Sequence, residues 1–334
     1  MLKEFVVMKK IQDTAQMLID RMLKDGYNPV YEVFVDVPFL QKVHASKVLW
    51  RGRYSERSLM FDDDLKDVFG LTDPTFDSHF QKATSGKGHE ISRIKRLHSS
   101  SLIALLCFHR VSKSSPIIFN VDGKEIKFTS VEFEFDEGLV GYDEKNEPHF
   151  SNIDVKLVSE DGSVILLLES KFTEYLSFGK QTEISDYVYT SYYNEMSSVI
   201  NQLGLVYRQQ TDEHKDVVPG KMCLESAKGN TQLYAQGLKQ MLSHTLGACH
   251  YAKTQSGVQV YLATIIFRFP NHIDNGKLAN YANAYRTWCG GLNQLSCVPP
   301  NLKVIESPYV YQEVFDKQNL ELVPERAGQY YKFL

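Results

Sequence analysis

The amino-acid sequence predicts a mixed α/β (α+β) fold in which helices flank a central mixed β-sheet. Two Asp-Gly pairs, at 122–123 and 161–162, each separate two apolar runs of strand length, and this pattern is typical of tight β-hairpins. Residues 231–251 have apolar side chains at helical spacing, and the apolar run 258–267 that follows has the length of a buried strand. A core of strands followed by helices, extended at both ends, fits this order.

Length and composition indicate a globular protein with room for a large core. The 334 residues allow one large domain or two smaller ones, and 43% apolar with 23% charged residues is ordinary for a soluble protein. The formal charge of −4 gives no global sign of nucleic-acid binding. Any surface that binds nucleic acid must therefore be a local patch.

The cysteines and the apolar runs predict a cytoplasmic protein without a membrane anchor. The five cysteines have no CxxC spacing, which favours reduced thiols over a disulfide framework or a structural zinc site. The N-terminus lacks the apolar core of a signal peptide. No apolar run approaches the roughly 20 residues that span a bilayer.

The first 98 residues predict an N-terminal extension and one basic segment. A helix over 2–23 and a strand over 31–37 belong to an extension that covers 1–85 and packs on the core. The segment 86–98 carries four cations that we expect to meet nucleic-acid phosphates: Lys87, Arg93, Lys95 and Arg96. A solvated helix face is the alternative. Ser99 and its serine neighbours offer N-caps for a buried helix over 102–108.

Two strands, 117–121 and 126–135, are predicted around the Asp122-Gly123 turn. Alternation places Glu132, Glu134 and Asp136 on one face of the second strand. The segment 138–150 reads as a polar loop at the mouth of a cleft.

The hairpin around Asp161-Gly162 is the most informative stretch. With those two residues as the turn, Asp154 lies directly opposite Glu169, and Lys171 lies on the same face. The other face carries only apolar residues and is expected to be the core face: Ile153, Val155, Leu157, Val164, Leu166 and Leu168.

Opposed carboxylates are unfavourable without a cation between them. They repel each other, raise each other's pKa and destabilise a hairpin. A Mg²⁺ ion, which takes one or two carboxylates and keeps several waters, would remove the conflict. The alternative is an α/β protein in which Asp154 and Glu169 are only surface charges.

Beyond the hairpin, 211–229 reads as a polar loop and 231–251 as a helix. Gln236, Gln240 and His244 follow one another at i, i+4 spacing beside the apolar stripe of that helix. A strand over 258–267 follows. The residues 271–334 are expected to form a C-terminal extension with a helix over 272–288 and a strand over 303–305.

The hairpin, the acidic strand before it and the helix after it resemble the PD-(D/E)XK nuclease superfamily, which has the restriction-endonuclease-like fold. Its pattern is an Asp early in one core strand and Glu-x-Lys at the end of the antiparallel neighbour, as Asp154 and Glu169-Ser170-Lys171 stand here. The resemblance covers roughly 90–270 and defines a core domain of 86–270. The order of elements looks like a bacterial branch of the superfamily.

The sequence departs from the family pattern in two places. Ile153 replaces the Pro that precedes the Asp. Some branches carry a Gln on the later helix with a Tyr four residues on, whereas Gln236 is followed at that distance by Gln240.

The resemblance implies a role for each motif residue. Asp154, Glu169 and the carbonyl of Ser170 would hold Mg²⁺, with Mn²⁺ as a substitute. Lys171 would orient or deprotonate the attacking water, or neutralise the scissile phosphate. Gln236 or Gln240 would position Lys171 or the substrate. Glu134 is the expected additional acid, with Glu132 or Glu90 in its place as alternatives.

The resemblance therefore implies a metal-dependent nuclease that hydrolyses phosphodiester bonds in DNA. RNA as substrate, endonuclease or exonuclease action, and a homodimer all stay open. The alternative is a non-catalytic nucleic-acid-binding or assembly protein on the same fold. Because the hairpin face with Lys171 is not the core face, Lys171→Ala is expected to abolish cleavage and leave folding intact.

Overall fold

The computed structural model describes residues 69, 71, 75–84, 99–142, 147–177, 183–184, 199, 202–211, 217–226, 238–316 and 318–331. For 183–184, 205–211, 217–226, 238–239, 272–273 and 329–330 the description is of the backbone only. The helix predicted over 2–23, the strand over 31–37 and the basic segment 86–98 lie outside these residues.

Seven of the described strands form one mixed sheet, in the order β1-β2-β3-β4-β8-β10 with β9 beside β8. The first four strands are antiparallel neighbours, and β8 runs parallel to β4, β9 and β10. The strands are β1 Ile117–Val121, β2 Lys124–Tyr142, β3 Pro148–Ser159, β4 Val164–Lys171, β8 Gln259–Ile266, β9 Leu302–Val304 and β10 Tyr309–Val310. The predicted mixed α/β class is confirmed.

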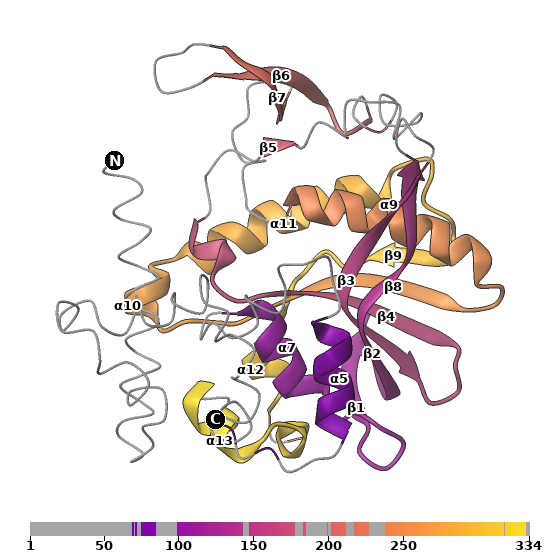
Figure 1. Ribbon diagram of the computed structural model, residues 1–334, viewed down its shortest axis with the longest axis vertical. Coiled ribbons are helices and arrows are strands. Elements are labelled where there is room, and N and C mark those ends of the chain that lie inside the picture. Colours follow the sequence, from indigo (N-terminus) through magenta and orange to yellow (C-terminus); the bar gives the residue numbers. More distant parts are fainter. Residues whose placement is uncertain are drawn as a thin grey trace.

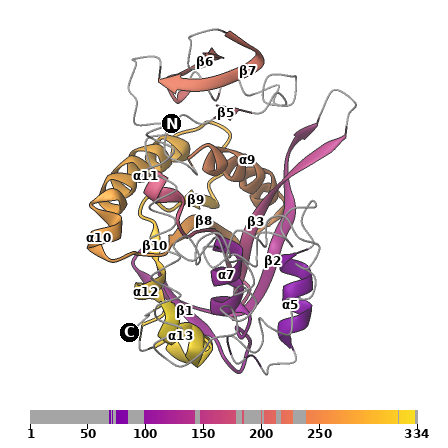
Figure 2. The same ribbon diagram turned by 60° about the vertical axis from the view of Figure 1, so that its left-hand side comes forward.

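Helices cover both faces of this sheet (Figures 1 and 2). On one face lie α5 (Thr75–Ala83) and α7 (Ser100–Phe108), and on the other lie α9 (Leu238–Thr254) and α11 (Lys277–Asn293). The remaining described elements are η3 Glu174–Ser177, α10 Asn271–Asp274, α12 Tyr311–Val314, η7 Leu320–Leu322 and α13 Glu325–Tyr331. A separate three-stranded sheet has the order β5-β7-β6, with β5 Glu183–Ile184, β6 Leu205–Thr211 and β7 Val217–Ser226.

The register predicted for the β3–β4 hairpin is confirmed. Val158 pairs with Ile165 and Lys156 with Leu167, as the Asp161-Gly162 turn requires. Gly162 has a φ of +73°, a left-handed conformation that glycine adopts at no steric cost. The apolar face predicted for the hairpin is buried against α7, where Leu166 and Leu168 have no exposed area.

The expectation that the opposite face is not part of the core is wrong. Leu167 is fully buried, and Glu169 and Lys171 are only 2% and 6% exposed. The cause is α9, which returns across this face before the chain enters β8. A central strand with helices on both faces is buried throughout, so β4 is not the half-exposed strand that a hairpin alone suggests.

The polar loop predicted over 138–150 is also wrong. The strand β2 continues to Tyr142 and β3 begins at Pro148, so the two strands form a long arm of which 143–146 lies outside the described residues. Pro148 is the first residue of its strand, a place where a missing N–H is tolerated. The loop predicted over 211–229 contains β7, which pairs with β6 and β5.

Several helix and strand predictions are confirmed. Ser99 caps α7, its side-chain oxygen accepting from the N–H of Leu102 at 3.1 Å. The helix predicted over 231–251 is described from Leu238, and β8 falls within the predicted 258–267. The helix predicted over 272–288 appears as α10 followed by α11, and β9 overlaps the strand predicted over 303–305. Because β9 and β10 join β8, the main sheet extends past residue 270.

Glu134 interrupts the regular geometry of β2. Its φ is +50°, a left-handed conformation that costs a residue with a Cβ roughly 1–2 kcal/mol. Residues i and i+2 of a regular strand share a face, yet Phe133 contacts His79 of α5 while Phe135 contacts Tyr251 of α9. The side chains of β2 therefore change faces at Glu134, which lies next to Asp154 on β3.

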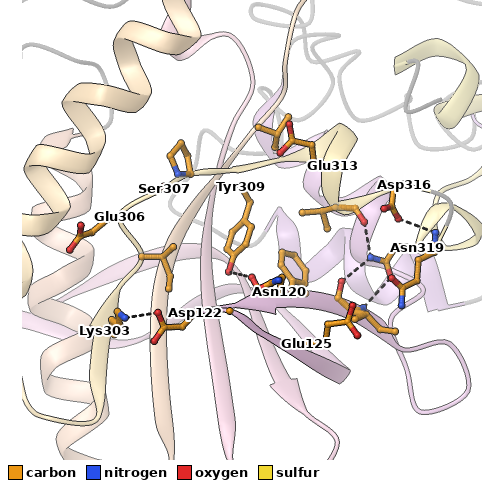
Figure 3. Close-up of a pocket in the computed structure, with 18 residues that line it drawn as sticks. Asn120, Asp122, Glu125, Lys303, Glu306, Ser307, Tyr309, Glu313, Asp316 and Asn319 are labelled. Carbon is orange, nitrogen blue, oxygen red and sulfur yellow. Dashed lines mark hydrogen bonds and ion pairs between the residues drawn. The ribbon is translucent and has the colours of Figure 1, made fainter.

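The two edges of the main sheet approach each other. The hydroxyl of Tyr309 on β10 donates to the carbonyl of Asn120 on β1 at 3.0 Å, and Lys303 on β9 pairs with Asp122 at 2.6 Å. Figure 3 shows both contacts across a pocket of about 660 Å³ that lies between the edges.

Asn319 covers part of the β1 edge. Its side-chain oxygen accepts from the N–H of Ile118 at 3.0 Å, and its side-chain nitrogen donates to the Ile118 carbonyl at 2.8 Å (Figure 3). The side chain thus makes the two hydrogen bonds that a neighbouring strand would otherwise make.

Candidate functional site

The main-chain ladder between β3 and β4 ends just before the predicted site. Its last pair is Val155 with Leu168, so Asp154 and Glu169 stand opposite each other one position beyond it. At this position the Asp154 side chain replaces the main-chain pairing, because its Oδ2 accepts from the N–H of Ser170 at 2.7 Å. The two strands diverge at this point, and the carboxylate lies in the gap.

The carbonyl of Ser170 faces the same gap. The carbonyl of Lys171 accepts from the N–H of Phe267, on the β8 side of the strand. Since successive carbonyls of a strand point to opposite sides, the Ser170 carbonyl points toward β3 and Asp154. Two of the predicted oxygen ligands thus lie on the same side of β4.

Glu169 and Lys171 form a buried ion pair that reaches the first turn of α9. Nζ of Lys171 is 2.6 Å from Oε1 of Glu169 and donates to Oε1 of Gln240 at 2.7 Å. Gln240 itself is exposed, and Asp154 is half-buried. The pair is therefore enclosed, but it borders on groups that solvent can reach.

His244 and Ser151 complete the network. Nε2 of His244 lies 2.9 Å from Oε2 of Glu169, and Nδ1 contacts the hydroxyl of Ser151. His244 is 2% and Ser151 4% exposed. A ring that carries its proton on Nε2 can accept from the serine hydroxyl at Nδ1, and its Nε2 then lies beside Oε2 of Glu169 without an aligned hydrogen bond.

The charges around Asp154 disfavour its ionised form. Burial raises its pKa well above the ordinary value, and the carboxylates of Glu169 and Glu134 raise it further. Lys171 and the Ser170 N–H lower the pKa only in part. A cation placed among these carboxylates would reverse the balance.

Glu169 and Lys171 have the opposite tendency, because each is paired. Burial alone would raise the pKa of Glu169, but Lys171 and His244 outweigh it and lower the pKa to about 2. Burial likewise disfavours the Lys171 ammonium, but Glu169, Glu174 and Asp154 together raise its pKa above the ordinary value. At neutral pH the pair is a carboxylate and an ammonium.

The structure brings together most of the predicted site residues. Asp154, Glu169, Ser170, Lys171 and Gln240 are in one network, and Glu134 lies near enough to act on the pKa of Asp154. Glu132 instead pairs with Lys156 at 3.3 Å. Six predicted residues lie outside the described residues: Lys87, Glu90, Arg93, Lys95, Arg96 and Gln236.

Sequence reasoning missed three residues of the network: Ser151, Glu174 and His244. The i, i+4 spacing placed His244 beside Gln240, and this was the only signal that could have found it. Nothing in the sequence links Ser151 to His244, because 93 positions separate them. Glu174 acts from η3, where its carboxylate also accepts from the N–H of Phe172 at 2.6 Å.

The donors near Asp154 do not form an all-protein metal cage. Within the described residues, no three side chains of His, Cys, Asp or Glu are grouped so as to hold a metal ion. Two carboxylates and a main-chain carbonyl are nevertheless a sufficient protein contribution for Mg²⁺, which usually keeps several waters and binds substrate phosphates.

Comparisons with protein-family models, with curated proteins and with solved structures each found no match. Among the helices that the structure describes, none is both long and apolar enough to cross a membrane.

Proposed function

We propose that the protein is a metal-dependent phosphodiesterase that cleaves DNA. The observation that carries the proposal is the position of Asp154 opposite Glu169 where the β3–β4 ladder ends, with Lys171 beside them. Burial and two neighbouring carboxylates disfavour the charge on Asp154, so the site is electrostatically incomplete without a further cation.

The order of elements supports a restriction-endonuclease-like core. Three antiparallel strands, β2, β3 and β4, are followed by a helix, α9, and by β8, which is parallel to β4. Such a core carries its Asp on the second of these strands and Glu-x-Lys on the third, as β3 and β4 do here. The resemblance stated from the sequence is thus compatible with the observed strand order.

Asp154 and the Ser170 carbonyl fit a Mg²⁺ ion best. Within the described residues, Oδ2 of Asp154 accepts one hydrogen bond and Oδ1 accepts none. Oε1 of Glu169 already accepts from Lys171, whereas Oε2 lies 2.9 Å from Nε2 of His244 without an aligned hydrogen bond, so Oε2 is the oxygen of Glu169 that is more available to a metal. Bound Mg²⁺ would lower the pKa of a coordinated water and offset negative charge on the phosphate.

Lys171 is suited to act as a cation. Its pKa lies above the ordinary value, so it is protonated at neutral pH and is not a general base in the metal-free protein. An ammonium held by Glu169 and Gln240 can hold a water or contact a phosphate oxygen. Gln240 keeps Nζ at the solvent-facing end of the network.

One observation favours the alternative, a non-catalytic nucleic-acid-binding or assembly protein. Glu169 and Lys171 are 2% and 6% exposed, so a phosphate reaches Lys171 only if the groups that cover it move. A purely structural ion pair would be equally buried.

The test is cleavage of supercoiled plasmid, single-stranded DNA and RNA with Mg²⁺ or Mn²⁺. Wild type is compared with Asp154→Asn, which keeps the side-chain acceptor for the Ser170 N–H but removes the charge. Glu160→Gln is the matched control, because it removes an exposed carboxylate at the other end of the same hairpin.

The proposal expects metal-dependent cleavage of DNA by wild type and Glu160→Gln, and none by Asp154→Asn. Cleavage of RNA alone would show that the substrate is RNA and not DNA. Equal cleavage by all three proteins would place the activity elsewhere. Nucleic-acid binding without cleavage by any of them would favour the alternative.

A further inference from the structure

The helix α9 docks on β4 through two polar pairs in matching register. Gln240 meets Lys171, and His244 meets Glu169. Four residues of a helix rise about 6 Å and two residues of a strand about 6.6 Å, so both pairs form together when the helix runs antiparallel to the strand. The arrangement fixes the axial position of α9 on the site.

The carboxylate of Glu169 is contacted at both oxygens. Lys171 donates to Oε1 at 2.6 Å, and Nε2 of the His244 ring lies 2.9 Å from Oε2. Only the Lys171 contact is aligned as a hydrogen bond, so the His244 ring limits rotation of the carboxylate plane through its close contact.

Ser151 in turn holds the ring. It lies on β3 three residues before Asp154, and its hydroxyl contacts Nδ1 of His244. With Nδ1 accepting from serine, Nε2 carries the ring proton and lies 2.9 Å from Oε2 of Glu169. Ser151 is itself enclosed by α9, because a Cβ added at Gly247 would stand 2.9 Å from the Ser151 Cβ. A serine that is 4% exposed and covered in this way cannot reach a substrate as a nucleophile.

We propose that His244, set in one tautomer by Ser151, is a positioning residue that orients the Glu169 carboxylate for metal binding. This inference rests on the proposed function. In this role His244 contacts the metal ligand Glu169, Ser151 contacts His244, and neither residue binds the metal itself. A donor that fixes a ligating carboxylate typically changes metal affinity by about 10–100-fold.

The test is calorimetry of Mn²⁺ binding to the full chain. Two variants of His244 distinguish the effect of its N–H group from the effect of its volume. His244→Gln keeps an N–H group near the position of Nε2, whereas His244→Leu keeps only bulk. We expect His244→Leu to weaken Mn²⁺ binding about 10–100-fold and His244→Gln to restore most of the affinity. Thermal melting checks that each variant is folded.

Ser151→Ala is the milder second variant, in case His244→Leu does not fold. It leaves the ring in place and removes only the partner of Nδ1, so a weaker loss of affinity is expected. If folded His244→Leu, or Ser151→Ala in its place, binds Mn²⁺ as wild type does, the inference is overturned while the proposed function stands. If wild type binds no Mn²⁺, both are overturned.

Cleavage kinetics provide a second readout for the positioning role. His244→Leu should lower kcat and leave KM for DNA nearly unchanged, because a side chain that is 2% exposed offers no surface to the substrate. An increase in KM alone would show that His244 acts on substrate binding instead, which contradicts the inference.

Discussion

Gly247 of α9 lies so close to Gly138 of β2 that a Cβ on Gly247 would stand 2.8 Å from the Gly138 carbonyl oxygen. The second atom that such a Cβ would meet belongs to Ser151, at 2.9 Å. Helix α9 therefore reaches the sheet closely enough for His244 to contact Ser151 only because neither glycine carries a side chain.

Gly247→Ala should therefore destabilise the protein by about 1–3 kcal/mol, since the helix must move off a rigid backbone. Gly290→Ala is the control, because its Cβ would meet nothing closer than a flexible Glu306 side-chain atom at 3.7 Å. That change should be neutral or stabilising by about 0.5–1 kcal/mol, as expected for Gly→Ala in a helix. Urea denaturation measures both. An equal effect of the two substitutions would contradict the close approach of Gly247.

Asp154→Asn should stabilise the metal-free protein at neutral pH. The folded-state pKa of Asp154 is raised by burial and by Glu169 and Glu134, so ionisation costs folded wild type free energy that the variant does not lose. The advantage should be absent below the unfolded pKa of about 4 and grow as pH rises toward the folded pKa.

Urea denaturation with a chelator from pH 4 to 8 measures this difference between Asp154→Asn and wild type. Addition of Mg²⁺ should then stabilise wild type and leave Asp154→Asn unchanged. A variant less stable than wild type at pH 7 without metal would mean that Asp154 is a satisfied structural carboxylate.

Lys171→Ala should destabilise the protein, contrary to the expectation drawn from the sequence. The carboxylate of Glu169 would lose its buried partner, a change that typically costs about 3–5 kcal/mol. Glu169→Gln should cost a similar amount, because it leaves a buried ammonium. The double variant Glu169→Gln with Lys171→Met should be more stable than either single change, and thermal melting of the three proteins tests this.

The pair also predicts how acid affects wild type. The pKa of Glu169 is lowered to about 2 in the folded protein from an ordinary value of 4.5, so its contribution is present above about pH 4.5 and is lost as pH falls toward 2. Glu169→Gln should lack this part of the acid dependence. An identical acid profile for wild type and Glu169→Gln would contradict the pairing.

Glu134→Gly should be more stable than Glu134→Ala by about 1 kcal/mol. Both remove the carboxylate, but only glycine adopts a φ of +50° without strain. Glu132, two residues earlier on the same strand, is the control, and there alanine should be the more stable substitution. Urea denaturation ranks the four variants, and the same order at both positions would contradict the left-handed conformation of Glu134.

The local part of the site could be predicted from the sequence, because turn chemistry sets it. The Asp161-Gly162 turn determines which residues of β3 and β4 face each other, and so brings Asp154 opposite Glu169. The i, i+4 spacing on α9 likewise placed Gln240 and His244 on one stripe.

What the sequence did not predict depends on packing between distant segments. Lys171 is buried by α9, which lies more than sixty residues later in the sequence. No pattern within the hairpin indicates this burial. The contact between Ser151 and His244 has the same origin. The long β2–β3 arm was predicted as a loop because its sequence is rich in glycines and polar residues. Main-chain hydrogen bonds nevertheless pair the two strands there.

The Asn319 side chain at the edge of β1 has a consequence for how copies of the chain meet. An uncovered edge strand is a template on which a second molecule can extend a sheet, the first step of many aggregation reactions. Asn319 occupies both main-chain groups of Ile118, and the Tyr309 hydroxyl occupies the carbonyl of Asn120. A foreign strand can pair with β1 at these positions only after it displaces these side chains, so the two side chains protect this edge of the sheet against strand addition.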